Sequence, residues 1–208
     1  MRVLVFDTET TGIIPSSITK LELMPYIVQC SFLTYDMTSH EIVHSYDNIV
    51  RVPNHVEISK KVSSIHGITN TISQEKGVPI ADILREFSEQ LQQCDVLVAH
   101  NIEFDKKMIE FECKRAQIPS PFTLRESLRE ICTMKEGTEL CNIIATNSRG
   151  SYKKWPTLGE LYNSLYGAPP REALHNSLVD VIVCLCCFLY MVTDKEISYE
   201  TLRGQINL

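Results

Sequence analysis

Residues that interrupt regular structure are scarce in this chain, which has 8 Gly and 9 Pro among 208 residues and no tract repeats. Collagen-like and low-complexity classes are therefore excluded. Long apolar runs are also missing: the longest, Val181–Val192, has 12 residues, whereas a membrane-spanning helix needs about 20. An excess of positive charge is missing too, since 20 Lys and Arg stand against 26 Asp and Glu, a formal net charge of −6. This balance excludes a histone-like or polybasic protein.

The pattern of a secretory signal is absent from the first residues, because the apolar stretch Val3–Phe6 is followed at once by acids. The eight Cys therefore predict free thiols in a reducing compartment rather than disulfides. Cys184, Cys186 and Cys187 share an apolar run, and their CxxC has no second CxxC or His pair to complete a zinc site. Buried core thiols are the better interpretation. We expect a soluble intracellular protein without membrane association, in the cytoplasm or the nucleus.

What is present is an ordinary globular composition, 44% hydrophobic and 22% charged. The length fits a single domain over residues 1–208. The patterns predict strands at 2–6, 27–35, 42–50 and 95–99, helices at 79–93, 103–117, 157–166 and 177–192, and a short helical or irregular segment at 56–65. Three strands followed by strands that alternate with helices indicate an α/β class, with helices packed on a central mixed sheet.

Positive charge is concentrated in residues 103–154, which hold 10 of the 20 Lys and Arg but only 8 of the 26 acids. Within this stretch, residues around 142–154 are expected to form a basic loop inserted into the domain. The cations that could follow a nucleic-acid strand are Lys106, Lys107, Arg149, Lys153 and Lys154, and either Tyr152 or Trp155 could stack on a base. The alternative is a solvated helix face and an ordinary surface loop.

Two acids follow the first predicted strand, in the motif Asp7-Thr8-Glu9. Residues i and i+2 of a strand point to the same face, so Asp7 and Glu9 project their carboxylates side by side. Carboxylates so close repel each other and are costly to remove from water. A site for Mg²⁺ or Mn²⁺, which bind carboxylate oxygens, would balance them. The alternative is a turn that exits abruptly into solvent.

Three further polar residues lie near predicted helix starts. Asp105 follows the strand at 95–99 and could be a third metal ligand, or an acid that favours a helix dipole. His100 and Asn101 could face the same cleft. Asp180 is preceded by His175, but five helical residues place the two about 140° apart, so His175 is expected on the loop before the helix. For Asp180 the alternative is a capping box with Ser177.

The segments FDTETTG, HNIEFD and HNSLVD, taken together, resemble the three motifs of the DEDDh 3′→5′ exonuclease family, and within it the DnaQ-like proofreading and stand-alone enzymes. The segments SSIHGIT (63–69) and WPTLGELYNSLYG (155–167) are also similar, and the resemblance extends from about Val3 to Leu189. It implies a ribonuclease H-like exonuclease fold. It also implies metal carboxylates at Asp7, Glu9, Asp105 and Asp180 and a general base at His175.

The resemblance further implies two Mg²⁺ or Mn²⁺ ions and water attack on the last phosphodiester, which releases a 5′-mononucleotide. The expected substrate is the 3′ end of DNA, preferably single-stranded, and the expected substrate-binding residues are Thr8, His66, Asn101 and Trp155. Two alternatives stay open: a 3′→5′ exoribonuclease, and a non-catalytic nucleic-acid-binding module. The complete set of acids and histidine favours an enzyme. A polymerase partner and the oligomeric state stay undetermined.

Overall fold

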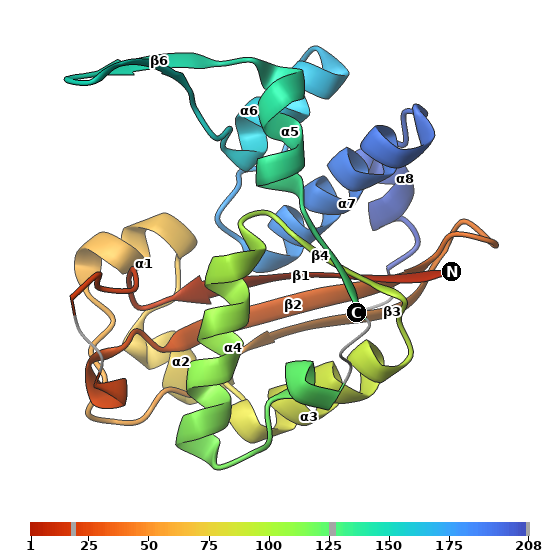
Figure 1. Ribbon diagram of the computed structural model, residues 1–208. Coiled ribbons are helices and arrows are strands. Elements are labelled where there is room, and N and C mark those ends of the chain that lie inside the picture. Colours follow the sequence, from red (N-terminus) through yellow and green to blue (C-terminus); the bar gives the residue numbers. More distant parts are fainter. Residues whose placement is uncertain (18–19, 125–127, 207–208) are drawn as a thin grey trace.

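A five-stranded mixed sheet forms the centre of the computed structural model, which describes residues 1–17, 20–124 and 128–206 (Figure 1). The strand order is β3-β2-β1-β4-β5. The antiparallel strands are β1 (Arg2–Thr10), β2 (Ile27–Asp36) and β3 (Glu41–Ile49). The strands β4 (Val96–Ala99) and β5 (Arg129–Cys132) run parallel to β1. This arrangement confirms the predicted α/β fold with a mixed sheet.

The central strand β1 extends four residues beyond the predicted apolar run. Asp7 pairs with Ser31 and Glu9 with Gln29 of β2, so both acids lie within the sheet rather than after it. The register shifts between Glu9 and Thr10, where the strand ends. The two carboxylates are therefore held on rigid, paired backbone.

Helices cover both faces of the sheet, because the residues of β1 alternate between them. On one face, Val3 and Val5 pack against α7 (Ser177–Thr193), together with α6 (Leu158–Tyr166) and α8 (Tyr199–Arg203). On the other, Leu4 and Phe6 pack against α3 (Ile80–Gln92) and α4 (Ile102–Ala116). Phe6, Phe32 and Phe87 meet there with ring centroids 5.2 and 5.5 Å apart. The site described below lies where these layers leave the end of β1 uncovered.

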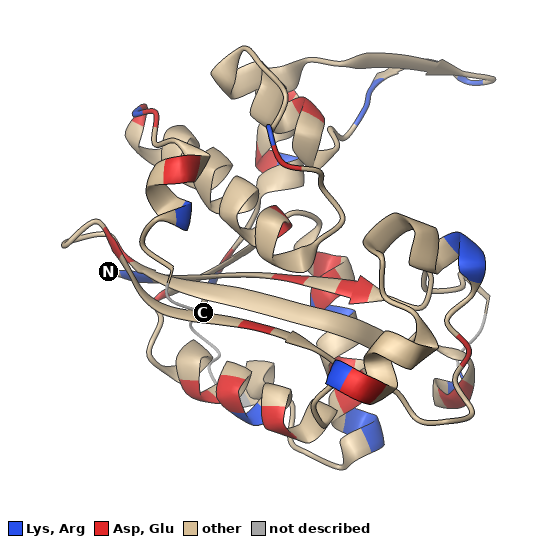
Figure 2. Cartoon of the chain, turned by 180° about the vertical axis from the view of Figure 1, so that it is seen from behind, with Lys and Arg blue, Asp and Glu red and all other residues tan. Residues whose placement is uncertain are grey.

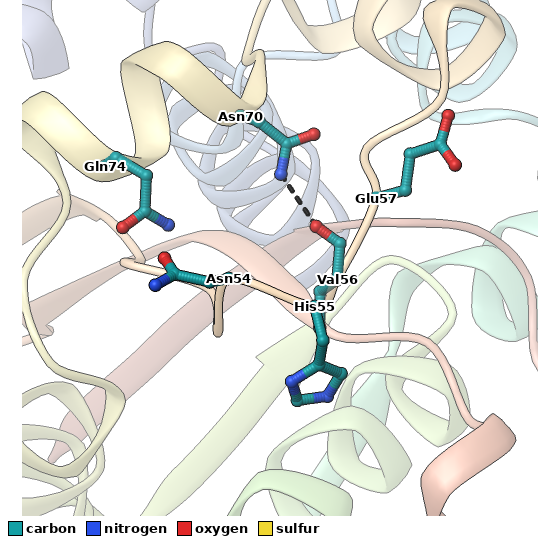
Figure 3. Close-up of a pocket in the computed structure, with 6 residues that line it drawn as sticks. All are labelled: Asn54, His55, Val56, Glu57, Asn70 and Gln74. Atoms are coloured by element: carbon teal, nitrogen blue, oxygen red, sulfur yellow. Dashed lines mark hydrogen bonds between the residues drawn. The ribbon is translucent and has the colours of Figure 1, made fainter.

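A smaller lobe beside the end of β1 holds α1 (Lys60–His66) and α2 (Asn70–Lys76), of which only the first was predicted. A polar cavity of about 270 Å³ separates α2 from the preceding segment (Figure 3). Asn70 spans it, donating to the Val56 carbonyl at 2.7 Å and accepting from the Ile58 amide at 2.9 Å. Gln74 donates to the Val52 carbonyl at 2.7 Å. These hydrogen bonds hold the segment before α1 against α2.

The region between α4 and α6 was the least predictable. After β5 come α5 (Thr133–Cys141) and a hairpin of β6 (Ile144–Asn147) and β7 (Gly150–Lys153), where a basic loop was expected. The hairpin extends away from the body at the top of Figure 1. Short 3₁₀ segments at Leu21–Leu23 and Pro121–Leu124 complete the described elements.

All eight cysteines are free, and seven of them are buried, which confirms the predicted core thiols. Cys184, Cys186 and Cys187 lie in α7 against the sheet. In the part of the chain that the structure describes, no helix has the length and apolarity needed to cross a membrane.

Candidate active site

A cavity of about 740 Å³ opens where β1 and β4 end and where α4 and α7 begin. The ends of these four elements bring together residues that are far apart in the sequence. The predicted site residues that line the cavity are Asp7, Thr8, Glu9, Asn101, Asp105, Trp155, His175 and Asp180. His66 does not line it. The structure therefore gathers all five predicted catalytic residues and three of the four predicted substrate-binding residues in one place.

Asp105 is held deep in this cavity by the backbone and side chain of β1. The Thr8 amide and hydroxyl both donate to its Oδ1, at 3.1 and 2.7 Å. Its side chain is only 3% exposed. Asp105 also lies in the first turn of α4, so the alternative interpretation of an acid that favours the helix dipole stays compatible with its position.

Asp180 and His175 meet at the start of α7. Asn176 is the residue that caps this helix, and its side chain accepts from the Val179 amide. The Ser177 hydroxyl instead donates to the Asp7 carbonyl at 2.7 Å, so the alternative capping box of Ser177 with Asp180 does not form. Asp180 accepts from the His175 amide at 2.9 Å. This bond holds the loop residue His175 beside the carboxylate, as its predicted position requires.

The backbone of His175 is left-handed, with φ 75°, a conformation that costs energy for a residue with a Cβ. The turn leaves its imidazole exposed at the edge of the cavity. One nitrogen of this ring and one carboxylate oxygen each from Glu9 and Asp180 lie within 4.8 Å of one another. The imidazole thus borders the acids without being buried among them.

The acids strongly influence one another's ionisation. The pKa of Asp7 is raised well above its usual value, first by burial and then by the negative charges of Asp105, Asp180 and Glu9. Burial raises the pKa of Glu9 to about 7. It also raises those of Asp105 and Asp180 to about 7, although the Thr8 groups and the His175 amide oppose the rise. Together the four carboxylates resist carrying four negative charges.

No Lys or Arg lines this cavity among the residues that the structure describes. The acids therefore receive no compensating charge from within it. Oxygen-rich clusters of this kind match the preference of hard divalent cations. The carboxylates fit such a cation, since one oxygen of Glu9 and one of Asp180 already lie within 4.8 Å of each other.

The predicted substrate-binding residues fall into two groups. Asn101 and Trp155 border the cavity; Asn101 begins α4 in a left-handed conformation, with φ 71°, and the Trp155 side chain is 60% exposed. His66 is buried outside the lining, where its Nδ1 accepts from the Ile68 amide at 3.1 Å. Burial lowers the pKa of His66, and the nearby His175 lowers it further. The prediction that His66 contacts substrate thus gains no support from its position.

His100 connects the two walls of the cavity. One ring nitrogen, Nε2, lies 3.0 Å from the Pro156 carbonyl, and Nδ1 lies 3.0 Å from the Thr133 hydroxyl. Because a carbonyl only accepts, Nε2 carries the proton and Nδ1 accepts from Thr133. Burial lowers the pKa of His100 to about 4, so the ring is neutral near pH 7. It therefore fixes the segment that holds Trp155, a role that the sequence did not reveal.

Apolar residues complete the lining and carried no recognisable signal in the sequence. Phe104, Met134, Leu158 and Leu174 come from four different segments. Each belongs to an ordinary helical or loop pattern, so only the tertiary arrangement identifies it as part of the cavity. These side chains give the cavity an apolar part beside its acids.

A family model described as Exonuclease matches residues 4–188 of the chain. Among solved structures, the nuclease domain of 3′hExo, a DEDDh family member bound to rAMP, superposes with a TM-score of 0.70 at 13% identity, covering 94% of this chain and 97% of that one. A 3′-exonuclease solved with a histone mRNA stem-loop gives 0.70 at 14% identity, covering 93% and 64%.

Exonuclease I of E. coli in complex with a dT13 oligonucleotide gives a TM-score of 0.65 at 12% identity, covering 91% of this chain. The match covers 41% of that enzyme, so the present chain corresponds to less than half of its length. At such identities these structures show a shared fold. A search of curated proteins found no match.

Proposed function

Because the chain belongs to the exonuclease family and is of its DEDDh type, we propose that it removes 5′-mononucleotides from the 3′ end of single-stranded DNA. The observation that carries this proposal is the convergence of four carboxylates and His175 on one cavity. Three separate segments supply these residues, and each matches its place in the motifs. Burying several carboxylates without a cation costs folding free energy, so the cluster favours a protein that binds metal ions there.

Asp7, Glu9, Asp105 and Asp180 are the residues that would hold two Mg²⁺ or Mn²⁺ ions. When bound, such ions lower the pKa of water and stabilise negative charge on the leaving oxygen. Asp7 interacts with all three of the other acids, since their negative charges raise its pKa. Thr8 orients Asp105 through two hydrogen bonds, and the His175 amide orients Asp180.

His175 is the proposed general base. Its ring stands at the open edge of the cluster, so it can accept a proton from the attacking water and release that proton to solvent. The bond between its amide and Asp180 limits how far the loop can carry the ring away. His100 has no such role, because both of its nitrogens already have hydrogen-bond partners.

The recessed position of the acids supports a preference for single strands. Asp105 and Asp180 are 3% and 7% exposed, so a terminal phosphodiester must enter the cavity to reach them. A paired end would first have to unpair, at a cost of a few kcal/mol. Trp155, exposed at the mouth, offers a surface on which an unpaired base can stack.

RNA is the second candidate substrate. It is favoured by the similarity to 3′hExo, whose structure contains rAMP, while the similarity to Exonuclease I, solved with dT13, favours DNA. The two differ at the 2′-hydroxyl, which a protein can read directly.

The test compares single-stranded DNA, blunt duplex DNA and RNA of one sequence, each labelled at the 5′ end, with Mg²⁺ and with Mn²⁺. We expect a ladder that shortens from the 3′ end, 5′-mononucleotides as products, and the highest rate on single-stranded DNA. An Asp7→Asn preparation purified in parallel controls for contaminating nucleases. A faster rate on RNA would replace DNA by the second candidate, and absence of cleavage on all three would overturn the proposal.

A further inference from the structure

The hairpin of β6 and β7, with its flanks, forms a protruding element that we call the arm (residues 142–154). Its two strands pair only with each other, and every residue of β7 is exposed. A two-stranded hairpin is at best marginally stable alone in water. Its direction away from the body, visible in Figure 1, therefore depends on how its base is held.

Two lysines fasten this base. Lys153 pairs with Glu139 of α5, and Lys154 pairs with Glu160 of α6 at 2.7 Å. The Lys154 amide also donates to the Ile143 carbonyl at 2.8 Å, which closes the hairpin. These lysines, expected from the sequence to contact a nucleic-acid strand, thus act first as anchors of the arm.

Beyond the anchors the arm presents a cation and an aromatic ring. Arg149 stands at its tip and makes no ion pair among the residues that the structure describes. Tyr152 is 48% exposed on β7. The arm contains three basic residues and no acid, in a chain whose net charge is −6. Figure 2 accordingly shows blue but no red along it.

The arm is continuous with the wall of the catalytic cavity. Trp155 follows Lys154 directly and lines the cavity, and His100 holds the next residue, Pro156, in place at 3.0 Å. Tyr152 precedes Trp155 by three residues. At about 3.3 Å per extended residue, Tyr152 lies about 10 Å along the chain from Trp155 and Arg149 about 20 Å. The exposed groups therefore form a track that leads outward from the cavity.

We propose that the arm binds the single-stranded DNA that leads into the cavity, upstream of its 3′ end. Tyr152 stacks on a base and Arg149 pairs with a phosphate, which are the two means by which proteins bind single strands without regard to sequence. A positively charged surface without acids fits a polyanion. This inference rests on the proposed function, because it assumes that the 3′ end occupies the cavity.

The test measures the affinity of the whole chain for 5′-labelled oligothymidylates of 4 and 16 nucleotides by fluorescence anisotropy. An Asp7→Asn background with Mg²⁺ prevents cleavage. In that background we compare Tyr152→Ala and Arg149→Gln with Arg85→Gln. Arg85 is an exposed cation of α3, on the opposite face of the sheet, and serves as the matched control.

Tyr152→Ala is expected to weaken binding of the 16-mer at least about fivefold, the low end for loss of one stacked base, and to leave the 4-mer within twofold. Arg149→Gln is expected to reduce the slope of log affinity against log salt by about 0.7, the value for one lost phosphate contact on a single strand. Arg85→Gln should change neither quantity. Melting temperatures of the variants verify that all are folded.

Wild-type affinity for the 16-mer in both arm variants would overturn the inference. So would an equal loss on both lengths, which would mean that the substitutions disturb the cavity itself. If the variants bind DNA normally but alter the sedimentation of the protein, the arm is an interface between copies and the inference is wrong. The proposed function fails separately, when the wild-type chain cleaves none of the substrates named above.

Discussion

Helix α4 carries two buried carboxylates, Asp105 and Glu112, and each is 3% exposed. Glu112 accepts from the Arg115 guanidinium at 2.8 Å and from the Ile27 amide at 3.0 Å. Among the described residues Asp105 accepts from the uncharged groups of Thr8, and the charge that acts on it is that of Glu9. The same helix therefore carries two equally buried carboxylates, of which one is paired with a cation and the other is not.

This difference distinguishes Glu112, whose carboxylate stabilises the fold, from Asp105, whose carboxylate is proposed to bind a cation. Arg115 also donates to the carbonyls of Leu21, Met24 and Pro25, so its pair with Glu112 ties the segment after β1 to α4. The negative charge there is balanced for the purpose of folding. At Asp105 the structure pairs the carboxylate with no cation among the described residues, and under the proposed function a divalent ion would balance the charge. A buried acid without a cationic partner is therefore a better candidate for a binding site than burial alone would indicate.

The largest expected effect is on catalysis. Asp7→Asn removes the central charge of the cluster and should lower the exonuclease rate about 10⁴-fold, since metal coordination contributes several kcal/mol to the transition state. Glu112→Gln, which keeps its acceptor oxygen, should stay within tenfold of the wild type. Rates on a labelled single strand with Mg²⁺ test both. Equal losses in the two variants would abolish the distinction between the two carboxylates.

His175→Ala tests the proposed general base independently of the four carboxylates. The rate should fall about 10²–10⁴-fold, a range usual for loss of a general base, while binding of Mn²⁺ and the melting temperature stay near wild type. The acidic limb of the pH–rate profile should weaken as well. Metal affinity, melting temperature and pH profile are measured on one preparation, and full activity would remove His175 from the mechanism.

Substitutions at the two carboxylates should affect the free energy of unfolding differently. Glu112→Ala leaves the partly buried Arg115 without its carboxylate and should cost about 3 kcal/mol of unfolding free energy. Asp105→Asn keeps an oxygen for both Thr8 hydrogen bonds and relieves repulsion, so without metal it should be neutral or slightly stabilising. Urea unfolding of metal-free protein provides the values. Strong destabilisation by Asp105→Asn would mean that this carboxylate is structural after all.

Metal should stabilise the cluster and have no effect on the pair. Mn²⁺ at 100 times its dissociation constant should add about 2.7 kcal/mol to the unfolding free energy of the wild type, because it binds the folded state. Asp105→Asn should lose most of this gain, and Glu112→Gln should retain it. NaCl at equal ionic strength is the control, and an equal response to both salts would contradict a specific site.

The smallest effect concerns pH in the absence of metal. The pKa values of Glu9, Asp105 and Asp180 are raised to about 7 in the folded protein, whereas the unfolded chain releases these protons near pH 4. The folded state therefore holds more protons between these values, and stability must fall as pH rises from about 4 to 7. We expect the unfolding free energy to decrease between pH 5 and 8, by less in Asp180→Asn and not at all in the presence of Mn²⁺. Metal-free melting curves at these pH values test it.

Elements with their own periodic apolar pattern were predictable from the sequence. The strands β2 and β3 and the helices α3, α4, α6 and α7 lie within a few residues of their expected bounds. The strand β1 was predicted too short, because a strand that continues through Asp7 and Glu9 has no apolar signal. Backbone pairing with β2 keeps this part of the chain in the strand, although its side chains are polar.

The region from β5 to β7 lacked such signals. The strand β5 has four residues, two of them charged, and stands at the edge of the sheet. Helix α5 contains Gly137, which a sequence pattern treats as a helix breaker. In the structure a Cβ there would lie 2.6 Å from Leu161, so this glycine permits close packing with α6. The turn of the hairpin uses Gly150 at φ 119° without an Asn-Gly or Asp-Gly signal.

The identities of the acids were predictable at the site, but not their mutual distances. The spacing in the sequence cannot show that Thr8 holds Asp105, or that Ser177 binds the Asp7 carbonyl instead of capping with Asp180. These contacts join segments more than 90 residues apart, which only the tertiary structure brings together. The raised pKa values follow from the same convergence.

The thiols of α7 make the opening of the core measurable by chemistry. Burial raises the pKa of Cys186 to about 12, and those of Cys184 and Cys187 are raised by burial as well. Because reagents attack the thiolate, these side chains become reactive only when the helix leaves the sheet. Cys141, only half-buried, reacts through smaller openings. In a time course of alkylation, early modification of Cys141 therefore reports local motion, and late modification of the α7 cysteines reports the opening of the core.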